Sequence, residues 1–165
     1  LPTHTHTQTQ FFSNSIPFIF FSAGIKDVIS KILTEKDVVV DEIISNEMVF
    51  SPTPPNKLIN FSPTLVHMYN KNLSMASAPT KTIIDSRSNC LLLGDGLGDA
   101  TMSDGMDVDP DKTLKIGFLN NDLDSNIDKY MGAFDLVIVG GDENFYFVNE
   151  LLKAIVDEVD TDFLA

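Results

Sequence analysis

Apolar runs and helically spaced apolar residues alternate along most of the chain. Apolar runs predict buried strands at residues 17–21 and 134–140, strands at residues 90–93 and 114–120, and one or two further strands at residues 38–45 and 48–50. Apolar residues at helical spacing predict helices over residues 25–33, 121–134 and 143–159. This alternation indicates βαβ units, and therefore an α/β fold whose mostly parallel sheet is covered by helices on both faces.

The predicted helices have defined inward faces, and one segment between the strands reads as a loop. Residues 51–64 are rich in Pro, Ser and Asn and predict a loop. In the second helix the expected inward stripe is Leu123, Ile127 and Met131. In the third helix it is Val148, Leu151, Leu152, Ile155 and Val159.

The first predicted strand runs directly into Ser22-Ala23-Gly24, and the first helix follows. Backbone N–H groups at such a corner point outward with the helix dipole behind them, which favours a bound phosphate. The hydroxyl of Ser22 adds one more donor there. The competing interpretation is that Ser22 only caps the helix, which is a common role for serine.

Lys71 lies in the segment LVHMYNKN, which we interpret as strand-like, with His67 as a partly buried strand residue. An ammonium group has three donors and suits a phosphate without requiring bidentate geometry. A solvated surface charge is the alternative for Lys71, and the residues alone leave both open.

The apolar run Cys90–Leu93 ends in GDGLGD, residues 94–99. Asp95 is expected at the carboxyl end of the strand and Asp99 in the first turn of a following helix. The carboxyl ends of parallel strands are where α/β folds bind ligands. Two carboxylates in a glycine-rich turn suit a hard cation such as Mg²⁺. The alternative is an acidic cap beside a tight turn.

Three other motifs fail on inspection. In GDGLGD, Asp99 stands where a dinucleotide fingerprint needs its third glycine, and a carboxylate would repel pyrophosphate. The acidic run after residue 106 lacks the glycine and the final glutamate of a calcium-binding loop. The same run, DVDPDKT, resembles a phosphatase nucleophile motif D-x-D-x-T, but Asp111 stands at its fifth position and no apolar strand precedes it.

Composition narrows the class of function. The 165 residues contain 11 Lys and Arg against 24 Asp and Glu, a formal net charge of −13. So acidic a chain cannot neutralise a nucleic-acid backbone or dock on an anionic membrane surface, and neither is an expected partner. The single cysteine, Cys90, cannot form an internal disulfide, which favours a reducing cytoplasmic setting.

The first residues carry little chemistry. We expect residues 1–15 to form a low-complexity or disordered tail and residues 16–165 to form one domain. His4 and His6 could share one face of a strand and bind a metal, but no third ligand is near. The apolar stretch 11–21 is not preceded by a basic residue and is too short to span a bilayer.

Six segments together resemble the cytosolic pyrimidine 5′-nucleotidases of the haloacid-dehalogenase superfamily. In chain order they are FIFFSAGIKDVI, HMYNKN, LLLGDGLGDATMSDG, LKIGFLN, DKYMGAFDLVIV and LLKAIV. The resemblance covers residues 17 to about 156. It implies a Rossmann-like parallel sheet with a helical cap, and Mg²⁺-dependent hydrolysis of nucleoside 5′-monophosphates through a phosphoaspartyl intermediate.

The resemblance also implies residue roles. Ser22 and the backbone of Ala23 match the groups that bind the phosphate, and Lys71 matches the lysine that neutralises it. Asp95 matches the Mg²⁺ ligand. Asp99 matches the carboxylate that supports the metal and the lysine.

Two departures from the family pattern matter. Gly96 replaces the serine of the usual GDS turn. The nucleophile motif D-x-D-x-T on the family's first, central strand is absent, and so is most of the cap that selects the base. Because the chain begins with Leu1, we interpret it as a fragment. Without the nucleophile we expect it to be inactive alone, and without the family's central strand we expect unpaired apolar strand edges. The alternatives are a non-catalytic nucleotide- or partner-binding paralogue and a truncated gene product.

Overall fold

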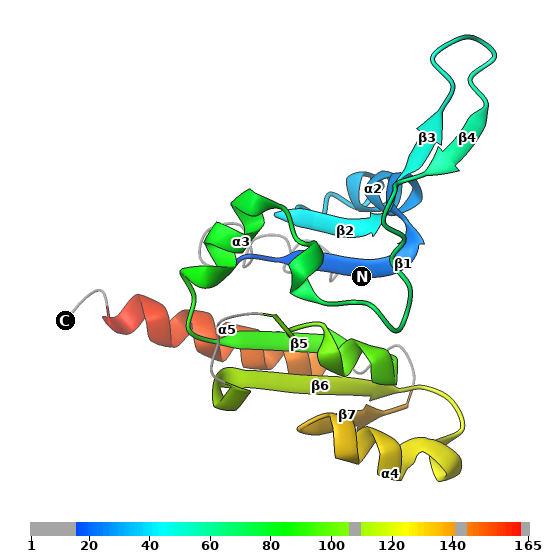
Figure 1. Ribbon diagram of the computed structural model, residues 1–165. Helices are drawn as coiled ribbons and strands as arrows, with labels where there is room; N and C mark the ends of the chain where they lie inside the picture. The colour runs from blue at the N-terminus through cyan, green and yellow to red at the C-terminus, as the bar shows by residue number, and fades with distance from the viewer. Residues whose placement is uncertain (1–15, 106–109, 141–144, 163–165) are drawn as a thin grey trace.

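In the part of the chain that the structure describes, the strands form two parallel sheets and one antiparallel hairpin. The structure is a computed structural model that describes residues 16–105, 110–140 and 145–162. Strand β1 (Ile19–Ile25) pairs in parallel with β2 (Glu42–Asn46). Strands β5 (Cys90–Gly94), β6 (Thr113–Leu119) and β7 (Leu136–Val139) form a second parallel sheet in that order. The hairpin consists of β3 (Met48–Phe50) and β4 (Leu58–Phe61) and projects from the body (Figure 1).

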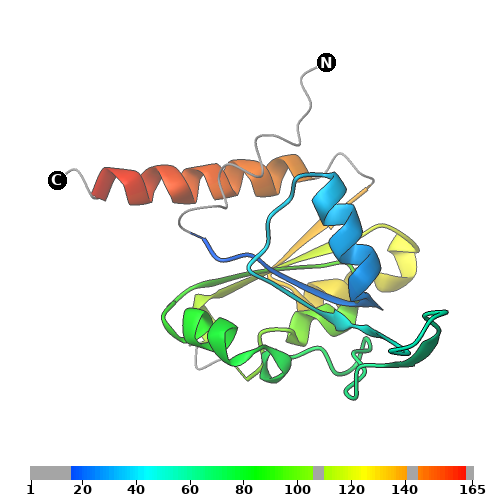
Figure 2. The ribbon, with the colours of Figure 1, turned by 90° about the horizontal axis from the view of Figure 1, so that it is seen from above.

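Helices lie on both faces of the strands, as the alternating pattern predicted. The α-helices are α2 (Lys26–Glu35), α3 (Ala78–Asp85), α4 (Leu123–Ala133) and α5 (Phe145–Asp162). Short 3₁₀ turns occur at η1 (Leu73–Met75), η2 (Leu97–Thr101) and η3 (Pro110–Lys112). Seen from above, α2 and α5 lie on one side of the strands, and α3 and α4 lie on the other (Figure 2). No helix in the described ranges is both long enough and apolar enough to cross a membrane.

The β5–β6–β7 sheet has an apolar core on each face. On one face, Tyr130 and Phe134 of the α4 segment pack with Leu92 of β5. On the other face, Val148 of α5 packs against the fully buried Ile116 of β6. Alternate residues of each strand therefore meet two different cores, which is why these strands read as continuous apolar runs.

Two predicted helix faces need correction. Leu123 and Met131 are 43% and 66% exposed, whereas Tyr130 is only 8% exposed. The inward face of α4 is thus Ile127, Tyr130 and Ala133, because the ends of β5 and β6 lie on that side. In α5, Val148 and Leu152 are buried as predicted and Ile155 is 39% exposed.

Two loop and strand assignments were also wrong. The segment predicted as a loop contains β4, which pairs with β3 despite its polar surroundings. Conversely, the segment LVHMYNKN forms no strand, and His67 is exposed rather than partly buried. The backbone there turns at residues 68–70, and the side chain of Asn70 bonds to the amide of His67 and the carbonyl of Leu65. Local side-chain bonds of this kind compete with strand pairing.

Some predictions concern residues outside the described ranges. They are the tail 1–15 with His4 and His6, residues 106–109 of the acidic run, the first residues of the predicted third helix at 143–144, and the side chain of Val159.

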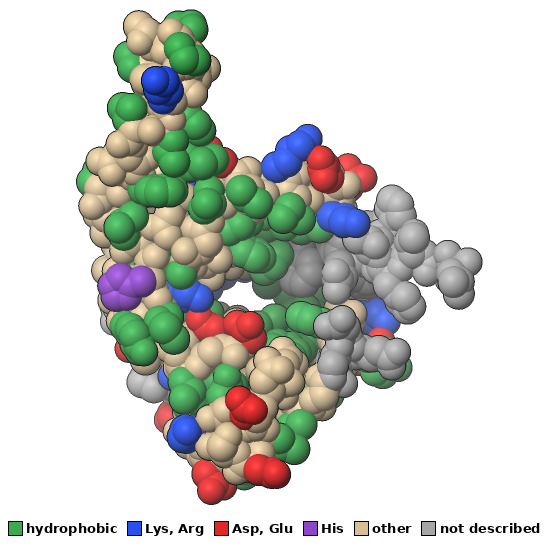
Figure 3. Space-filling view, turned by 90° about the vertical axis from the view of Figure 1, so that its right-hand side faces the viewer, with side chains coloured by type: hydrophobic (Ala, Val, Ile, Leu, Met, Phe, Trp, Pro, Cys, Tyr) green, Lys and Arg blue, Asp and Glu red, His purple; other side chains and the backbone are tan. Residues whose placement is uncertain are grey.

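The two parallel sheets face each other along the edges formed by β1 and β5, which are not hydrogen-bonded to each other. Among the described strands, β1 is hydrogen-bonded only to β2, and β5 only to β6. In Figure 1 these free edges face one another. The space-filling view shows a hollow between the half that carries β1 and the half that carries β5, with basic and acidic side chains at its rim (Figure 3). Among the described residues, no strand pairs with these edges of β1 and β5, as expected for unpaired strand edges.

Candidate functional site

The phosphate-binding candidates Ser22 and Ala23 lie within β1 rather than after it. The strand continues to Ile25, and Ile25 is the N-terminal cap of α2 without any side-chain capping bond. Ser22 therefore does not cap the helix, and that alternative is wrong. The Oγ of Ser22 instead accepts a hydrogen bond from the amide of Gly24 at 3.0 Å. Its own hydroxyl proton remains able to donate to a ligand.

Lys71 lies in a loop and forms a buried ion pair. Its Nζ is 2.7 Å from Oδ1 of Asp99, and the two side chains are only 13% and 7% exposed. The alternative of a solvated surface charge is therefore wrong for Lys71. Because the ammonium group of Lys71 is mostly shielded from water, its carboxylate partner holds it in one position.

Asp99 also organises the turn that follows β5. Its Oδ2 accepts hydrogen bonds from the amides of Asp95 at 3.1 Å and Gly96 at 3.0 Å. Only glycine fits at two positions of this turn, Gly94 and Gly98. A Cβ on Gly94 would lie 2.3 Å from the Cβ of Asp99, and one on Gly98 would lie 2.1 Å from the carbonyl oxygen of Met68. The loop of Lys71 and the turn of Asp99 are thus in direct backbone contact.

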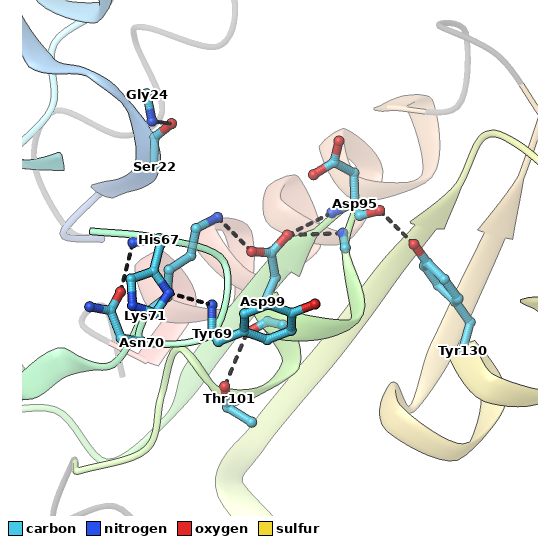
Figure 4. A network of polar contacts seen from close by, with 12 residues as sticks. Ser22, Gly24, His67, Tyr69, Asn70, Lys71, Asp95, Asp99, Thr101 and Tyr130 are labelled. Atoms are coloured by element: carbon cyan, nitrogen blue, oxygen red, sulfur yellow. Dashed lines mark hydrogen bonds and ion pairs between the residues drawn. The ribbon is translucent and has the colours of Figure 1, made fainter. Parts of the chain in front are cut away.

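Asp95 stands at the carboxyl end of β5, as predicted, and its side chain is exposed. Its carboxylate makes no hydrogen bond or ion pair with a described residue and points away from Asp99 (Figure 4). Its backbone carbonyl accepts a hydrogen bond of 2.6 Å from the hydroxyl of Tyr130 on α4. Burial raises the pKa of Tyr130, and the negative charges of Asp95 and Asp99 raise it further. This phenol therefore stays protonated and keeps donating.

The arrangement brings together Lys71, Asp95 and Asp99 but leaves Ser22 apart. Figure 4 shows Ser22 and Gly24 on the β1 side of the opening and the two aspartates on the β5 side. Within the described ranges no group of three His, Cys, Asp or Glu residues could hold a metal ion. The carboxylate of Asp95 has no partner among the described residues, whereas both carboxylate oxygens of Asp99 accept hydrogen bonds. One free carboxylate fits Mg²⁺, which commonly binds one or two carboxylates and completes its shell with water and substrate phosphate.

Two residues at this site escaped the sequence analysis. Tyr130 fell within a predicted helix without an assigned role, and Asn46 fell in no predicted element. The side chain of Asn46 bonds to the carbonyl oxygens of Ala23 and Val66 and to the amide of Val66. All of these contacts join residues at least 20 positions apart, so no local pattern could have revealed them.

Comparisons with known proteins identify the family of this chain. The family model described as pyrimidine 5′-nucleotidase (UMPH-1) matches residues 4–156. The 7-methylguanosine phosphate-specific 5′-nucleotidase of Mus musculus is 37% identical over 152 residues, which cover 90% of this chain and 49% of the mouse protein. The protein of that name from Gallus gallus is 35% identical, with 87% and 50% covered.

A solved structure shows the same fold. Cytosolic 5′-nucleotidase IIIB bound to cytidine superimposes with a TM-score of 0.77 at 27% identity, over 93% of this chain and 51% of that one. The present chain thus spans about half the length of the curated relatives it matches. The match of the family model over nearly all of the chain shows that this chain belongs to the pyrimidine 5′-nucleotidase family.

Proposed function

We propose that this chain supplies the phosphate- and metal-binding groups of a 5′-nucleotidase that hydrolyses nucleoside 5′-monophosphates to a nucleoside and phosphate. The observation that carries the proposal is the buried Lys71–Asp99 pair beside the free carboxylate of Asp95. A desolvated ammonium and a neighbouring oxygen ligand for a cation are the groups that stabilise charge on a transferring phosphoryl group.

Each residue has a separate role in this proposal. The hydroxyl of Ser22 and the amide of Ala23 bind phosphate oxygens near the C-terminal end of β1. The Nζ of Lys71 neutralises the phosphate. Asp99 does not bind ligand, because its oxygens hold Lys71 and the turn around Asp95.

Asp95 would hold Mg²⁺. When bound, this ion polarises the phosphoryl oxygens and offsets negative charge in the transition state. The hydrogen bond from Tyr130 to the carbonyl of Asp95 fixes the backbone from which the carboxylate extends. The proposal assigns one protein carboxylate of this chain to the metal and leaves the other ligands to water, substrate and residues beyond this chain.

Covalent phosphoryl transfer needs a nucleophile, and residues 1–165 contain no D-x-D-x-T motif after an apolar run. We propose that the nucleophile and its neighbouring acid come from polypeptide beyond these residues. In this proposal residues 16–165 are part of the core domain, and the complete enzyme acts in the cytoplasm.

A second candidate function follows from the open strand edges. No described strand pairs with the facing edges of β1 and β5, although natural sheets usually protect such edges. A non-catalytic paralogue that binds a nucleotide or a partner protein through these edges would retain Ser22, Lys71 and Asp95 without turnover. Phosphate release distinguishes the two candidates only when the missing polypeptide is present.

The nucleobase of the substrate is to be identified with two probes. The family model is described as a pyrimidine 5′-nucleotidase, and the curated relatives are named for 7-methylguanosine phosphate. We infer a nucleoside 5′-monophosphate from the phosphate site, and both CMP and 7-methyl-GMP are suitable probes.

The test uses the 165-residue chain with CMP or 7-methyl-GMP in MgCl₂. We expect saturable binding, followed by NMR chemical shifts, and no phosphate release above background. Asp95→Asn should weaken Mg²⁺-dependent binding, whereas Asp128→Asn on the exposed side of α4 should not. Clear turnover by this chain would refute the proposed source of the nucleophile. An equal dependence of binding on MgCl₂ in Asp95→Asn and the wild type would refute the metal role of Asp95.

A further inference from the structure

The stretch of β1 that carries Ser22 departs from regular strand pairing. Residues 19–21 pair with residues 42–44 of β2 in continuous register, but the register shifts before Ile25 pairs with Asn46. Backbone carbonyls in a shifted segment lose their regular ladder partners and need others. Two side chains at the end of β2 supply them. The Oγ of Ser45 donates to the carbonyl of Gly24 at 2.7 Å, and the Nδ2 of Asn46 donates to the carbonyl of Ala23 at 2.8 Å.

The bond from Asn46 also determines the direction of an amide. The peptide between Ala23 and Gly24 is trans, so its carbonyl and its N–H lie in the peptide plane and point in opposite directions. While Asn46 holds the carbonyl, the N–H of Gly24 points away from β2 and bonds to the Oγ of Ser22. The orientation of the Ser22 hydroxyl therefore depends on Asn46 through a single rigid peptide group.

The same amide side chain holds the loop that leads to Lys71. Its second Nδ2 hydrogen bonds to the carbonyl of Val66 at 2.9 Å, and its Oδ1 accepts from the amide of Val66 at 2.8 Å. Val66 is itself buried at 5% exposure. Both donors and one acceptor position of Asn46 are thus in use, and they connect the end of β1, which carries Ser22, with the loop that carries Lys71.

We propose that Asn46 is a positioning residue that sets the Ser22 hydroxyl and the Lys71 loop in register for one phosphate group. This inference rests on the proposed phosphate-binding function. Asn46 itself does not contact the ligand in this account. Asparagine is the required residue type, because the two carbonyls need donors and the Val66 amide needs an acceptor.

The test measures CMP binding in MgCl₂ by wild-type chain, Asn46→Ala and Asn46→Asp. Asn46→Ala removes all three bonds without adding charge, and we expect about tenfold weaker binding. Asn60→Ala is the matched control, since the side chain of Asn60 bonds only to the neighbouring amide of Phe61. Circular dichroism gives the folded fraction of each variant, and affinities are compared for folded protein.

The pH dependence of CMP binding by Asn46→Asp distinguishes a positioning role from a merely structural one. Its carboxylate would face two carbonyl oxygens, which favours the protonated form, and protonation restores one O–H donor. The affinity of this variant relative to wild type should therefore recover as the pH falls from 8 to 5. The ratio for Asn60→Asp, whose side chain lies on the exposed hairpin, should stay constant over that range.

The outcomes separate the two hypotheses. Absence of CMP binding by the wild-type chain would overturn the proposed function and this inference with it. Wild-type binding that Asn46→Ala leaves unchanged would overturn the positioning role alone. If the variants do not fold, the NMR spectrum of the wild-type chain tests the positioning role. The side-chain amide signal of Asn46 should shift on CMP addition together with the backbone amide signals of Gly24 and Val66. A shift of Gly24 without Asn46 would refute the role.

Discussion

Replacing Asp99 with asparagine tests how much the Lys71–Asp99 ion pair contributes to the stability of the site. The substitution keeps the shape of the side chain and removes its charge. Asp99 accepts three hydrogen bonds, from the ammonium of Lys71 and from the amides of Asp95 and Gly96. An asparagine offers one oxygen and one NH₂ group. Whichever way it turns, its NH₂ faces either the ammonium or the two amides, so a buried donor loses its acceptor.

The size of the effect follows from burial. The side chains of Lys71 and Asp99 are 13% and 7% exposed, so this pair belongs with buried ion pairs rather than surface ones. Breaking a buried pair by removing one partner costs about 3–5 kcal/mol, because the other charge remains without compensation. We expect Asp99→Asn to lower the free energy of unfolding by about 3 kcal/mol, the lower end, because one oxygen acceptor remains. That is a large share of the roughly 5–15 kcal/mol typical of a domain.

Urea unfolding followed by circular dichroism measures this difference. Glu35→Gln is the matched control, because Glu35 forms an exposed pair with Lys31 in α2, with side chains 61% and 71% exposed. Such pairs contribute about 0–1 kcal/mol. In the double variant Lys71→Met/Asp99→Asn, neither charge is left unpaired, so the loss should be smaller than the sum of the single losses. Equal losses for Asp99→Asn and Glu35→Gln would refute the account of the site as a buried, charge-paired unit.

Three further predictions concern the neighbours of this pair. Gly98→Ala should destabilise the chain by about 1–3 kcal/mol in urea unfolding, because the added Cβ would lie 2.1 Å from the carbonyl oxygen of Met68; an unchanged midpoint would contradict this contact. Tyr130→Phe should cost about 1–3 kcal/mol by leaving the carbonyl of Asp95 without its donor. Because the pKa of Tyr130 is raised in the folded state, this phenol favours folding below its unfolded pKa of about 10 and loses that contribution as the pH rises through the raised value. The wild type should therefore show a late tyrosinate absorbance component that Tyr130→Phe lacks. Removal of Mg²⁺ with EDTA should weaken CMP binding by at least about tenfold, measured by NMR titration, and undiminished affinity would argue against a metal at Asp95.

The fold was predictable where local pattern and burial agree. Strands β5, β6 and β7 were recognisable because both faces of each strand meet a core, which leaves continuous apolar runs in the sequence. Strand β4 was missed because it lies on a projecting hairpin with exposed faces, where no such constraint acts on composition. The segment around His67 was misread because four of residues 65–69 are apolar, although residues 67–69 are exposed on a loop.

The site was predictable only in part, for a related reason. Asp95 follows from its position after a buried strand, which local pattern can show. The pairing of Lys71 with Asp99 spans 28 residues and came from the family resemblance rather than from spacing. The contacts of Asn46 and Tyr130 depend on how separate βαβ units are packed, so they became visible only in three dimensions.

The charges at the site explain why a cation belongs to the proposed mechanism. The positive charge of Lys71 is already balanced by Asp99, and Asp95 adds an unpaired negative charge, so these three groups carry a net charge of about −1 at neutral pH. The whole chain carries −13. A phosphate monoester has a charge of about −1.5 to −2 at pH 7, so without a counterion it would meet net repulsion. A divalent cation at Asp95 reverses that sign and leaves the donors of Ser22 and Lys71 free to orient the phosphate. The dependence of binding on Mg²⁺ should therefore be lost in Asp95→Asn, whose neutral side chain removes both the repulsion and the ligand.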